Sequence, residues 1–342
     1  MTMTRRRILG GIAAAPALVA GLRPARAAGP RTLKISHQFP GGTIDSGDFR
    51  DRLVRRFAAE VEKRTNDELK FEIYPGSSLM KTIPQFSAVR KAALDMSLYP
   101  LAYAGGEVPE VNIGLMPCLV TSYQQGLNWK KTEIGKELTA ALEKKGVKLI
   151  TWVWQAGGVA SRATPVISPG DVKGLKIRGG SREMDLMLKE AGGIISSVPS
   201  DEIYAAMQTG ALDAAVTSST SLISFRLEEI AKNVTTGRGG SFWFMLEPLI
   251  MSKEIYDGLT ADQKKVVSAV GEEMEAFGLS QAKADDDSLA TVYGKAGVKV
   301  AEMNAEILGK WREIAQATAW KDFAARNADC AKLLKLAEAV TA

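Results

Sequence analysis

Strand-like and helix-like segments alternate through most of this chain, and the alternation constrains its fold more than any other feature. Residues 69–75 have apolar side chains at every second position, whereas residues 46–65 have an apolar stripe at helical spacing, with Ser46 as a plausible N-cap. Helical crossovers between strands cover both faces of a parallel sheet. The pattern therefore predicts an α/β protein with mostly parallel sheets and helices on both faces.

The alternation forms two units, followed by a helical C-terminal part. The first unit ends with a helical pair over 122–145 and a strand over 147–154, and the second ends with a strand over 240–246. From Thr260, which with Gln263 fits a capping box, a helical pattern runs towards residue 293. This helix carries three consecutive acids, and we interpret them as a solvated face because no histidine or turn-forming glycine loop accompanies them: Asp285, Asp286 and Asp287.

The first 27 residues form a separate segment. A basic start, an apolar stretch over 8–22 and a small-residue site at 25–27 are typical of an export signal. Arg5 and Arg6 resemble the pair of a twin-arginine signal, and an ordinary secretory signal with an additional arginine is the alternative. Both alternatives place the mature protein in the periplasm.

Charge and motif content argue against several classes of function. The signal contains five arginines and no acid, so the mature chain has 39 basic and 39 acidic residues and no charge that suggests a nucleic-acid partner. The single histidine, His37, and two distant cysteines, Cys118 and Cys330, do not complete a metal site. Cys118 lies in an apolar run and is expected to be buried. Because nucleotide-binding and hydrolase motifs are also missing, we expect no metal, no cofactor and no enzyme activity.

Arg178 ends a predicted strand over 174–178, and Gly179, Gly180 and a helix capped by Ser181 follow it directly. Ligands of open α/β sheets bind outside the carboxyl ends of strands, and a helix N-terminus adds partial positive charge there. An arginine in this position either receives a ligand carboxylate or pairs with an acid of the protein. The residues alone leave both interpretations open.

Arg162 follows a segment that leaves one unit and enters the other. It either faces the cleft between the units or is a solvated loop residue. Alternate positions of a strand face opposite sides, so most aromatic side chains at such crossings belong to the core and one or two cover a ligand. The aromatic residues at the crossings are Trp152, Trp154, Phe242, Trp243 and Phe244.

Four segments carry a resemblance to a known family: "YPGSSL", "VKGLKIR", "EIYAAMQTGALDAA" and "LIMSKEIYDGLTADQKKVV". Over nearly its whole mature length the chain resembles the solute-binding proteins of tripartite ATP-independent periplasmic (TRAP) transporters. The resemblance implies a two-lobed clamshell of the type II-like periplasmic binding proteins, with a long C-terminal helix bracing both lobes. It predicts lobe I over 30–155 and about 245–280, and lobe II over 156–244 and about 285–338.

The resemblance also implies a function, namely a receptor that captures a small organic acid between its lobes and delivers it to membrane permease subunits. Arg178 matches the arginine that pairs with the ligand carboxylate, and Arg162 matches a frequent second cationic contact. The other predicted ligand contacts lie where strands open onto the cleft: His37, Gln38, Tyr99, Thr217, Phe242, Trp243 and Phe244. Two alternatives stay open, an exported enzyme on the same scaffold and a receptor that serves a sensor.

Two positions bear on the choice of ligand. Thr217 and Ser200 carry small hydroxyls, where sialic-acid binders of this family often have an asparagine and an aromatic residue. We therefore expect a compact mono- or dicarboxylate, such as a keto, hydroxy or aromatic acid, rather than a highly polar sugar acid.

Overall fold

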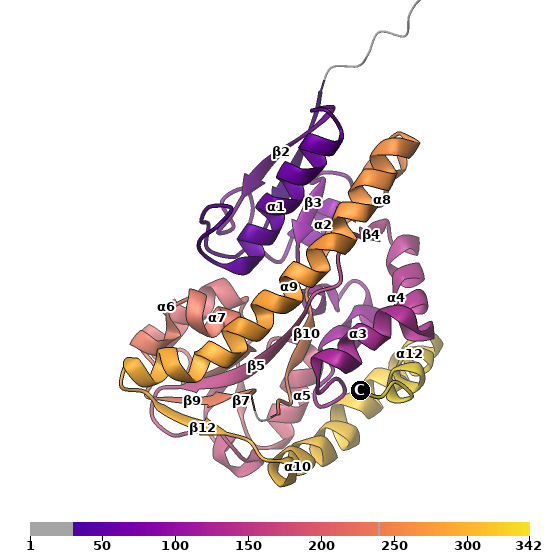
Figure 1. The fold of residues 1–342 in the computed structure, drawn as a ribbon. Helices are drawn as coiled ribbons and strands as arrows, with labels where there is room; N and C mark the ends of the chain where they lie inside the picture. The colour runs from indigo at the N-terminus through magenta and orange to yellow at the C-terminus, as the bar shows by residue number, and fades with distance from the viewer. Residues whose placement is uncertain (1–29, 239) are drawn as a thin grey trace, which may run out of the picture.

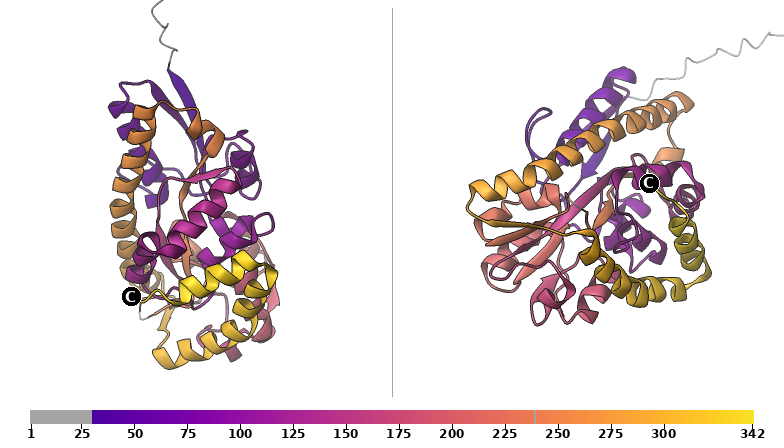
Figure 2. Two further views of the ribbon diagram at one scale, coloured as in Figure 1. Left: turned by 90° about the vertical axis from the view of Figure 1, so that its right-hand side faces the viewer. Right: turned by 60° about the horizontal axis from the view of Figure 1, so that its bottom comes forward.

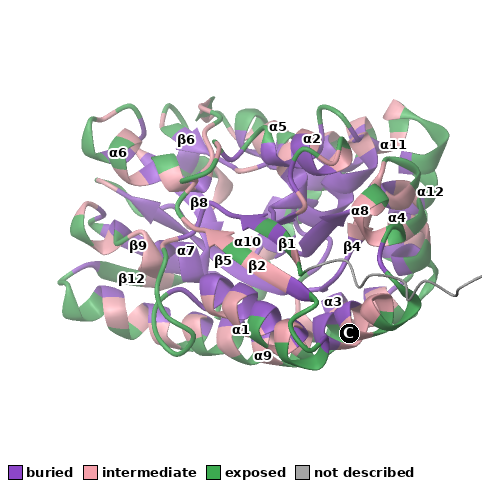
Figure 3. Ribbon diagram, turned by 90° about the horizontal axis from the view of Figure 1, so that it is seen from above, coloured by how far each residue is buried: buried purple, intermediate pink, exposed green. Residues whose placement is uncertain are grey.

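The computed structural model describes residues 30–238 and 240–342 (Figure 1). The predicted export signal therefore lies outside the described residues. Two sheets, each covered by helices, form two lobes joined by crossing strands and by one long helix. Seen from above, the buried strands lie between helices whose outer faces are exposed (Figure 3). No helix in this part of the chain combines the length and apolarity needed to cross a membrane.

The sheet of lobe I has the strand order β2-β1-β3-β11-β4. Strands β2, β1 and β3 are parallel, and β11 lies antiparallel between β3 and β4. Because Ser36 of β1 pairs with Ser97 of β3, the carboxyl ends of these two strands lie side by side. The strand bounds are β1 Arg31–Ser36, β2 Leu69–Tyr74, β3 Met96–Leu98, β4 Val147–Leu149 and β11 Leu249–Ser252.

The sheet of lobe II has the order β12-β9-β5-β8-β6-β7, and β10 pairs with the start of β5. The β6–β8 pair is parallel, whereas β5 runs antiparallel to both β8 and β9. The expectation of mostly parallel sheets fails at the strands by which the chain enters or leaves a lobe, β5, β10 and β11. The bounds are β5 Trp154–Ser161, β6 Lys176–Arg178, β7 Ile194–Ile195, β8 Ala214–Ser218, β9 Asn233–Thr236, β10 Phe244–Leu246 and β12 Lys299–Glu302.

Helix α1 (Phe49–Arg64) shows how the predicted periodicity builds the core of lobe I. The side chains at four-residue spacing are buried, as predicted: Phe49, Leu53, Phe57 and Val61. The helix begins later than Ser46 because Asp48 is its N-cap, with a carboxylate that accepts a hydrogen bond from the backbone N–H of Arg50.

Helix α9 (Ala261–Lys295) runs along both lobes and is the predicted brace (Figures 1 and 2). It packs against α1 of lobe I and against α7 (Ser219–Ser224), β5 and β9 of lobe II. Thr260 and Gln263 form the predicted capping box at its start. The interpretation of the three acids as a solvated face is wrong for Asp286, which is buried and accepts a hydrogen bond from Ser219 at 2.7 Å.

The strand predicted over 147–154 is interrupted between the lobes. The backbone N–H groups of Ile150 and Thr151 donate to the carbonyl of Leu249, and that of Trp152 donates to Glu275 of α9. The chain therefore leaves the first sheet after β4 and enters the second only at Trp154. The first two bonds tie the crossing to β11, and the third ties it to the bracing helix.

The C-terminal part also departs from prediction. Its helices are α10 (Ala305–Ala315), a π-helical turn (Gln316–Trp320), α11 (Lys321–Arg326) and α12 (Ala328–Glu338). Helix α10 packs on α5 of lobe II, but α12 packs against α4 and a 3-10 helix over Pro109–Leu115. The first helix of the segment 285–338 thus packs on lobe II, whereas its last helix packs on α4, which contacts β4 of lobe I.

The remaining helices lie between consecutive strands of the chain. Their bounds are α2 Gln85–Arg90, α3 Tyr123–Lys131, α4 Glu133–Lys144, α5 Arg182–Glu190, α6 Ile203–Gln208 and α8 Lys253–Asp257. Helix α7 ends at Ser224, and Arg226 just beyond it adopts a left-handed conformation with φ of 56°. Cys118 and Cys330 are both buried and free.

Candidate functional site

Arg178, the last residue of β6, lies at the carboxyl end of the lobe II sheet and is only 2 % exposed. Its Nε donates to the carbonyl of Val198 at 3.0 Å and its Nη1 donates to the carbonyl of Val216 at 2.8 Å. Its Nη2 donates to the hydroxyl of Tyr103 at 2.6 Å. All three acceptors are neutral.

No carboxylate of the described residues lies within ion-pair distance of the Arg178 guanidinium. The structure thus does not contain the alternative in which this arginine pairs with an acid of the protein. Each terminal nitrogen of a guanidinium carries two N–H groups, and one on each is engaged here. A pair of N–H groups on Nη1 and Nη2 remains available to an anion.

Arg50 shows what a structural ion pair looks like in this protein. This fully buried arginine of α1 binds Asp48 with Nη2 to Oδ2 at 2.7 Å and approaches Glu247 with Nη1 to Oε2 at 3.3 Å. It also donates to Ser221 of α7 at 3.0 Å, so it connects lobe I, the crossing before β11 and lobe II. The sequence did not single out this residue, because an arginine near a helix start resembles an ordinary solvated side chain.

Gly180 makes room for the Arg178 guanidinium. Its φ of +95° is the left-handed conformation that favours glycine, and a Cβ there would lie 2.6 Å from Nη1 of Arg178. The N–H of Gly179 donates to Asp185 at 3.1 Å. The glycines therefore shape the space around the arginine, and the Gly179 N–H is not free for a ligand.

Ser181 fixes the start of α5 as predicted. Its hydroxyl accepts a hydrogen bond from the N–H of Met184 at 3.0 Å and donates to the carbonyl of Leu115 at 3.2 Å. Beside this helix start, a hollow of about 460 Å³ opens between the lobes. Its lining includes Ile83 and Tyr103 from lobe I and Asp185 and Val198 from lobe II.

Tyr103 belongs to the site, although the sequence did not indicate it. It lies on a 3-10 helix (Leu101–Ala104) that follows β3 of lobe I, and its hydroxyl accepts hydrogen bonds from Arg178 and from the N–H of Ser200 at 3.0 Å. Tyr99 packs edge-on against it, with ring centroids 6.1 Å apart. The Tyr99 hydroxyl donates to the carbonyl of Ile83. The predicted site residue Tyr99 therefore contacts Tyr103 through its ring, while its hydroxyl is engaged by the backbone.

His37 and Gln38, the predicted contacts at the end of β1, face opposite sides of the sheet. His37 points to α1, where its Nε2 lies 3.2 Å from Asp51, and its ring stacks on Phe39. Gln38 is 2 % exposed, and neither polar atom of its amide has a hydrogen-bond partner among the described residues. Ser36 of β1 pairs with Ser97 of β3. Gln38 and Tyr99 each lie two residues beyond this pair, so they lie at the neighbouring ends of the two strands.

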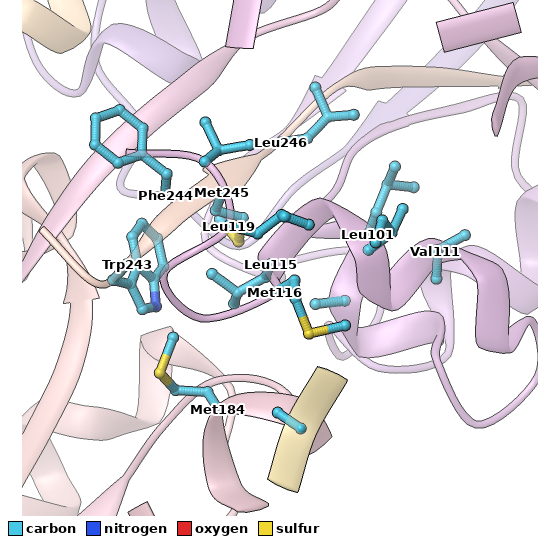
Figure 4. Close-up of a cluster of buried hydrophobic side chains, with 14 of the residues drawn as sticks. Leu101, Val111, Leu115, Met116, Leu119, Met184, Trp243, Phe244, Met245 and Leu246 are labelled. Atoms are coloured by element: carbon cyan, nitrogen blue, oxygen red, sulfur yellow. The ribbon is translucent and has the colours of Figure 1, made fainter. Parts of the chain in front are cut away.

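The predicted contacts on β8 and at the start of β10 are all buried. Thr217 pairs with Gly158 and directly follows Val216, whose carbonyl holds Arg178. Trp243 packs on Gly157, where a Cβ would collide with its indole, and Figure 4 places it in a hydrophobic cluster with Leu115 and Met184.

The two neighbouring phenylalanines pack against helices. The ring centroid of Phe242 lies 4.9 Å from that of Trp311 on α10, and Phe244 lies 5.2 Å from Tyr123 on α3. Both rings are buried by these contacts. Their role as ligand contacts stays a prediction.

Arg162 does not face the cleft. It follows Ser161, which pairs with Ala214, the first residue of β8, and its N–H donates to the carbonyl of Asp213 just before that strand, whereas the Arg178 guanidinium reaches the carbonyl of Val216 further along it. Because β5 is antiparallel to β8, the end of β5 points away from the lobe I side. Arg162 lines a separate surface hollow with Tyr204 and Glu229.

Within residues 30–238 and 240–342, no cluster of three or more histidine, cysteine, aspartate or glutamate side chains is arranged to hold a metal ion. The arrangement around Arg178 is suited to another task. A buried cation with free N–H groups, between two lobes, provides a binding position for a small anion.

Comparison with known proteins agrees with this geometry. The family described as "Bacterial extracellular solute-binding protein, family 7" matches residues 45–327. A solute-binding protein of Albidiferax ferrireducens is 62% identical over 338 residues, which cover 98% of this chain and 99% of that protein. The C4-dicarboxylate-binding periplasmic protein DctP of Rhodobacter capsulatus is 27% identical over 316 residues, covering 91% and 92% of the two chains.

A crystal structure provides a further comparison. The TRAP periplasmic solute binding protein of Rhodoferax ferrireducens, solved with bound malonate, is 65% identical to this chain with a TM-score of 0.88. The match covers 90% of this chain and 97% of that one. The chain therefore belongs to family 7 of the bacterial extracellular solute-binding proteins and is a periplasmic solute receptor of the TRAP type rather than an enzyme.

Proposed function

We propose that this receptor captures a small organic acid between its lobes, with the acid's carboxylate on Arg178, and delivers it to TRAP permease subunits in the membrane. The observation that carries the proposal is the buried guanidinium with neutral protein partners only. A buried charge is costly unless an opposite charge and hydrogen bonds compensate it. A ligand carboxylate provides both.

In this proposal the two oxygens of one carboxylate accept the remaining N–H groups on Nη1 and Nη2 of Arg178. The Val198 and Val216 carbonyls and the Tyr103 hydroxyl fix the plane of the guanidinium before the ligand arrives. Such preorganisation reduces the entropy lost on binding. Closure of the lobes then buries the acid, and the acid shifts the open–closed equilibrium by its preference for the closed state.

A compact dicarboxylate is the ligand class we favour. The 65% identical receptor was solved with malonate, and the DctP relative is named for C4-dicarboxylates. Gln38 offers a second recognition point on the lobe I side, because its buried amide provides both a donor and an acceptor without a partner among the described residues. These features support an acid with a second polar group a few bonds from the first carboxylate.

Calorimetry on the protein purified from the periplasm tests ligand capture. Malonate, succinate and their hydroxy and keto derivatives form the ligand panel, and Arg178→Gln is compared with Arg162→Gln as a matched control outside the cleft. We expect at least one acid to bind, Arg178→Gln to lose about 100-fold or more in affinity, and Arg162→Gln to bind like the natural protein. Unchanged affinity in Arg178→Gln would refute the role of this residue.

Delivery requires a separate measurement. Uptake of the labelled acid into proteoliposomes that contain the permease subunits is expected to depend on the receptor and to fall with Arg178→Gln. Equal uptake with and without the receptor would contradict the delivery step and would favour a receptor that serves a sensor.

A further inference from the structure

Two neighbouring residues of lobe II bind lobe I close to Arg178. The N–H of Ser200 donates to the Tyr103 hydroxyl at 3.0 Å. The Oδ2 atom of Asp201 accepts hydrogen bonds from the hydroxyls of Ser77 at 2.8 Å and Thr82 at 3.1 Å. We call these five residues the interlobe latch.

The hydroxyl of Tyr103 accepts two hydrogen bonds, one from Nη2 of Arg178 and one from Ser200. A phenol oxygen has two acceptor positions and one proton to donate, so both acceptor positions are in use. No acceptor for the remaining O–H proton occurs among the described residues. The proton is therefore free to be donated beside the two unengaged N–H groups of Arg178.

We propose, on the basis of the function proposed above, that Tyr103 is a ligand-positioning residue whose hydroxyl donates to the acid held by Arg178, and that the interlobe latch keeps it there. Arg178 lies on lobe II, whereas Tyr103 follows β3 of lobe I. The acid can accept bonds from both only when the lobes are closed. Tyr103 thus makes the closed state preferable for an occupied receptor.

The Asp201 end of the latch holds the two lobes together independently of the acid. Ser77 and Thr82 lie on the loop after β2, and their oxygens are 3.0 Å apart, so one carboxylate oxygen serves both. The backbone N–H of Ser77 donates to the carbonyl of His37, which fixes the loop over the end of β1. When the lobes separate, Asp201 exchanges these bonds for water. The latch therefore slows opening more than it changes the first encounter with the acid.

The test compares Tyr103→Phe with Tyr204→Phe, a partly buried tyrosine of lobe II that lies in the hollow with Arg162 and whose hydroxyl donates to Glu229. Malonate and the tightest acid of the panel are the probes. Tyr103→Phe is expected to raise the dissociation constant about 10- to 100-fold, as for loss of a hydrogen bond to a charged group, and to leave the melting temperature of the ligand-free protein unchanged. Tyr204→Phe is expected to bind like the natural protein.

The second pair is Asp201→Ala and Glu202→Ala, where Glu202 is the adjacent exposed acid. Stopped-flow fluorescence is expected to show about tenfold faster release from Asp201→Ala with little change in the association rate, and natural rates for Glu202→Ala. Spectroscopic labels on the two lobes measure the fraction of closed protein at saturating acid. This fraction is expected to be smaller for Tyr103→Phe and for Asp201→Ala than for the natural protein.

The outcomes separate the two proposals. If Arg178→Gln abolishes binding while Tyr103→Phe binds and closes like the natural protein, the positioning role is wrong and the proposed function stands. A fall in ligand-free melting temperature that accounts for the weaker binding of Tyr103→Phe also overturns the positioning role. If the natural protein binds none of the acids, the proposed function and this inference both fail.

Discussion

The hydroxyl of Tyr103 lies 2.6 Å from Nη2 of Arg178, although the two residues belong to different lobes. Because the Tyr103 hydroxyl is uncharged, this hydrogen bond orients the guanidinium without cancelling its charge. Arg50 contrasts with this arrangement, because its Nη2 lies 2.7 Å from a carboxylate oxygen of Asp48. The protein thus contains one buried arginine whose charge is balanced within the fold and another, Arg178, whose hydrogen-bond partners in the fold are all neutral.

Replacement of Arg178 by lysine is expected to weaken acid binding by about 100-fold or more, because an ammonium group is a point charge without the planar fork. Lysine also cannot maintain the three separate bonds to Val198, Val216 and Tyr103. Calorimetry with the tightest acid of the panel measures the loss. Binding of Arg178→Lys at natural affinity would show that only the charge matters.

Gly180→Ala is expected to weaken binding about tenfold and to lower the free energy of unfolding by roughly 1–2 kcal/mol. The added Cβ would lie 2.6 Å from Nη1 of Arg178 at a φ of +95°, so both the guanidinium and the backbone must shift. Gly170→Ala is the matched control, since a Cβ there meets nothing within 4 Å. Calorimetry and urea unfolding measure the two effects, and equal behaviour of the two variants would contradict the packing argument.

Arg50→Leu is expected to destabilise the fold by about 3–5 kcal/mol, because it leaves the buried carboxylates of Asp48 and Glu247 without their partner. Arg64→Leu is the comparison, since Arg64 pairs with Glu60 and Glu273 at the surface and is expected to cause only a small change. Urea unfolding measures both. A small effect of Arg50→Leu would mean that these carboxyl groups are neutral in the folded protein.

Burial raises the pKa of Glu183 to about 7, while hydrogen bonding to Asn112 at 2.8 Å and the charge of Arg326 oppose the rise. Between pH 4.5 and about 7 the folded state therefore binds more protons at this group than the unfolded state does. Stability from this group is present below that window and is lost as pH rises through it.

The variant Glu183→Gln is expected to lose this pH dependence. Relative to the natural protein, it should gain up to about 3 kcal/mol in free energy of unfolding between pH 4.5 and 8, since one pKa unit corresponds to about 1.4 kcal/mol. Urea unfolding at several pH values measures the difference between the two proteins. A difference that is the same at every pH would contradict the raised pKa.

Local patterns in the sequence predicted the elements that depend on local chemistry. The buried stripe of α1, the capping box of α9 and the position of Arg178 between β6 and α5 all follow from residues close together in the chain. The two-lobed arrangement came instead from family resemblance. Element ends were less predictable, as at Ser46 and Arg226, because a cap or a left-handed residue depends on competing local bonds.

The missing parts of the site depend on contacts between distant segments. Tyr103 binds Arg178 of the other lobe, which lies 75 residues away in the sequence. Asp201 binds Ser77 and Thr82, which lie 124 and 119 residues away. Arg162 lies outside the cleft because β5 runs antiparallel to β8, a strand direction that the sequence does not reveal. The sequence predicts a solvated Asp286, because the packing of α7 on α9 that buries it joins segments distant in the chain.

A crystal structure of the periplasmic protein with its tightest acid measures the central claim most directly. The account predicts one carboxylate with its two oxygens about 3 Å from Nη1 and Nη2 of Arg178, and one of them within hydrogen-bond distance of the Tyr103 hydroxyl. An acid bound away from Arg178, or a carboxylate of the protein turned onto its guanidinium, would contradict the account.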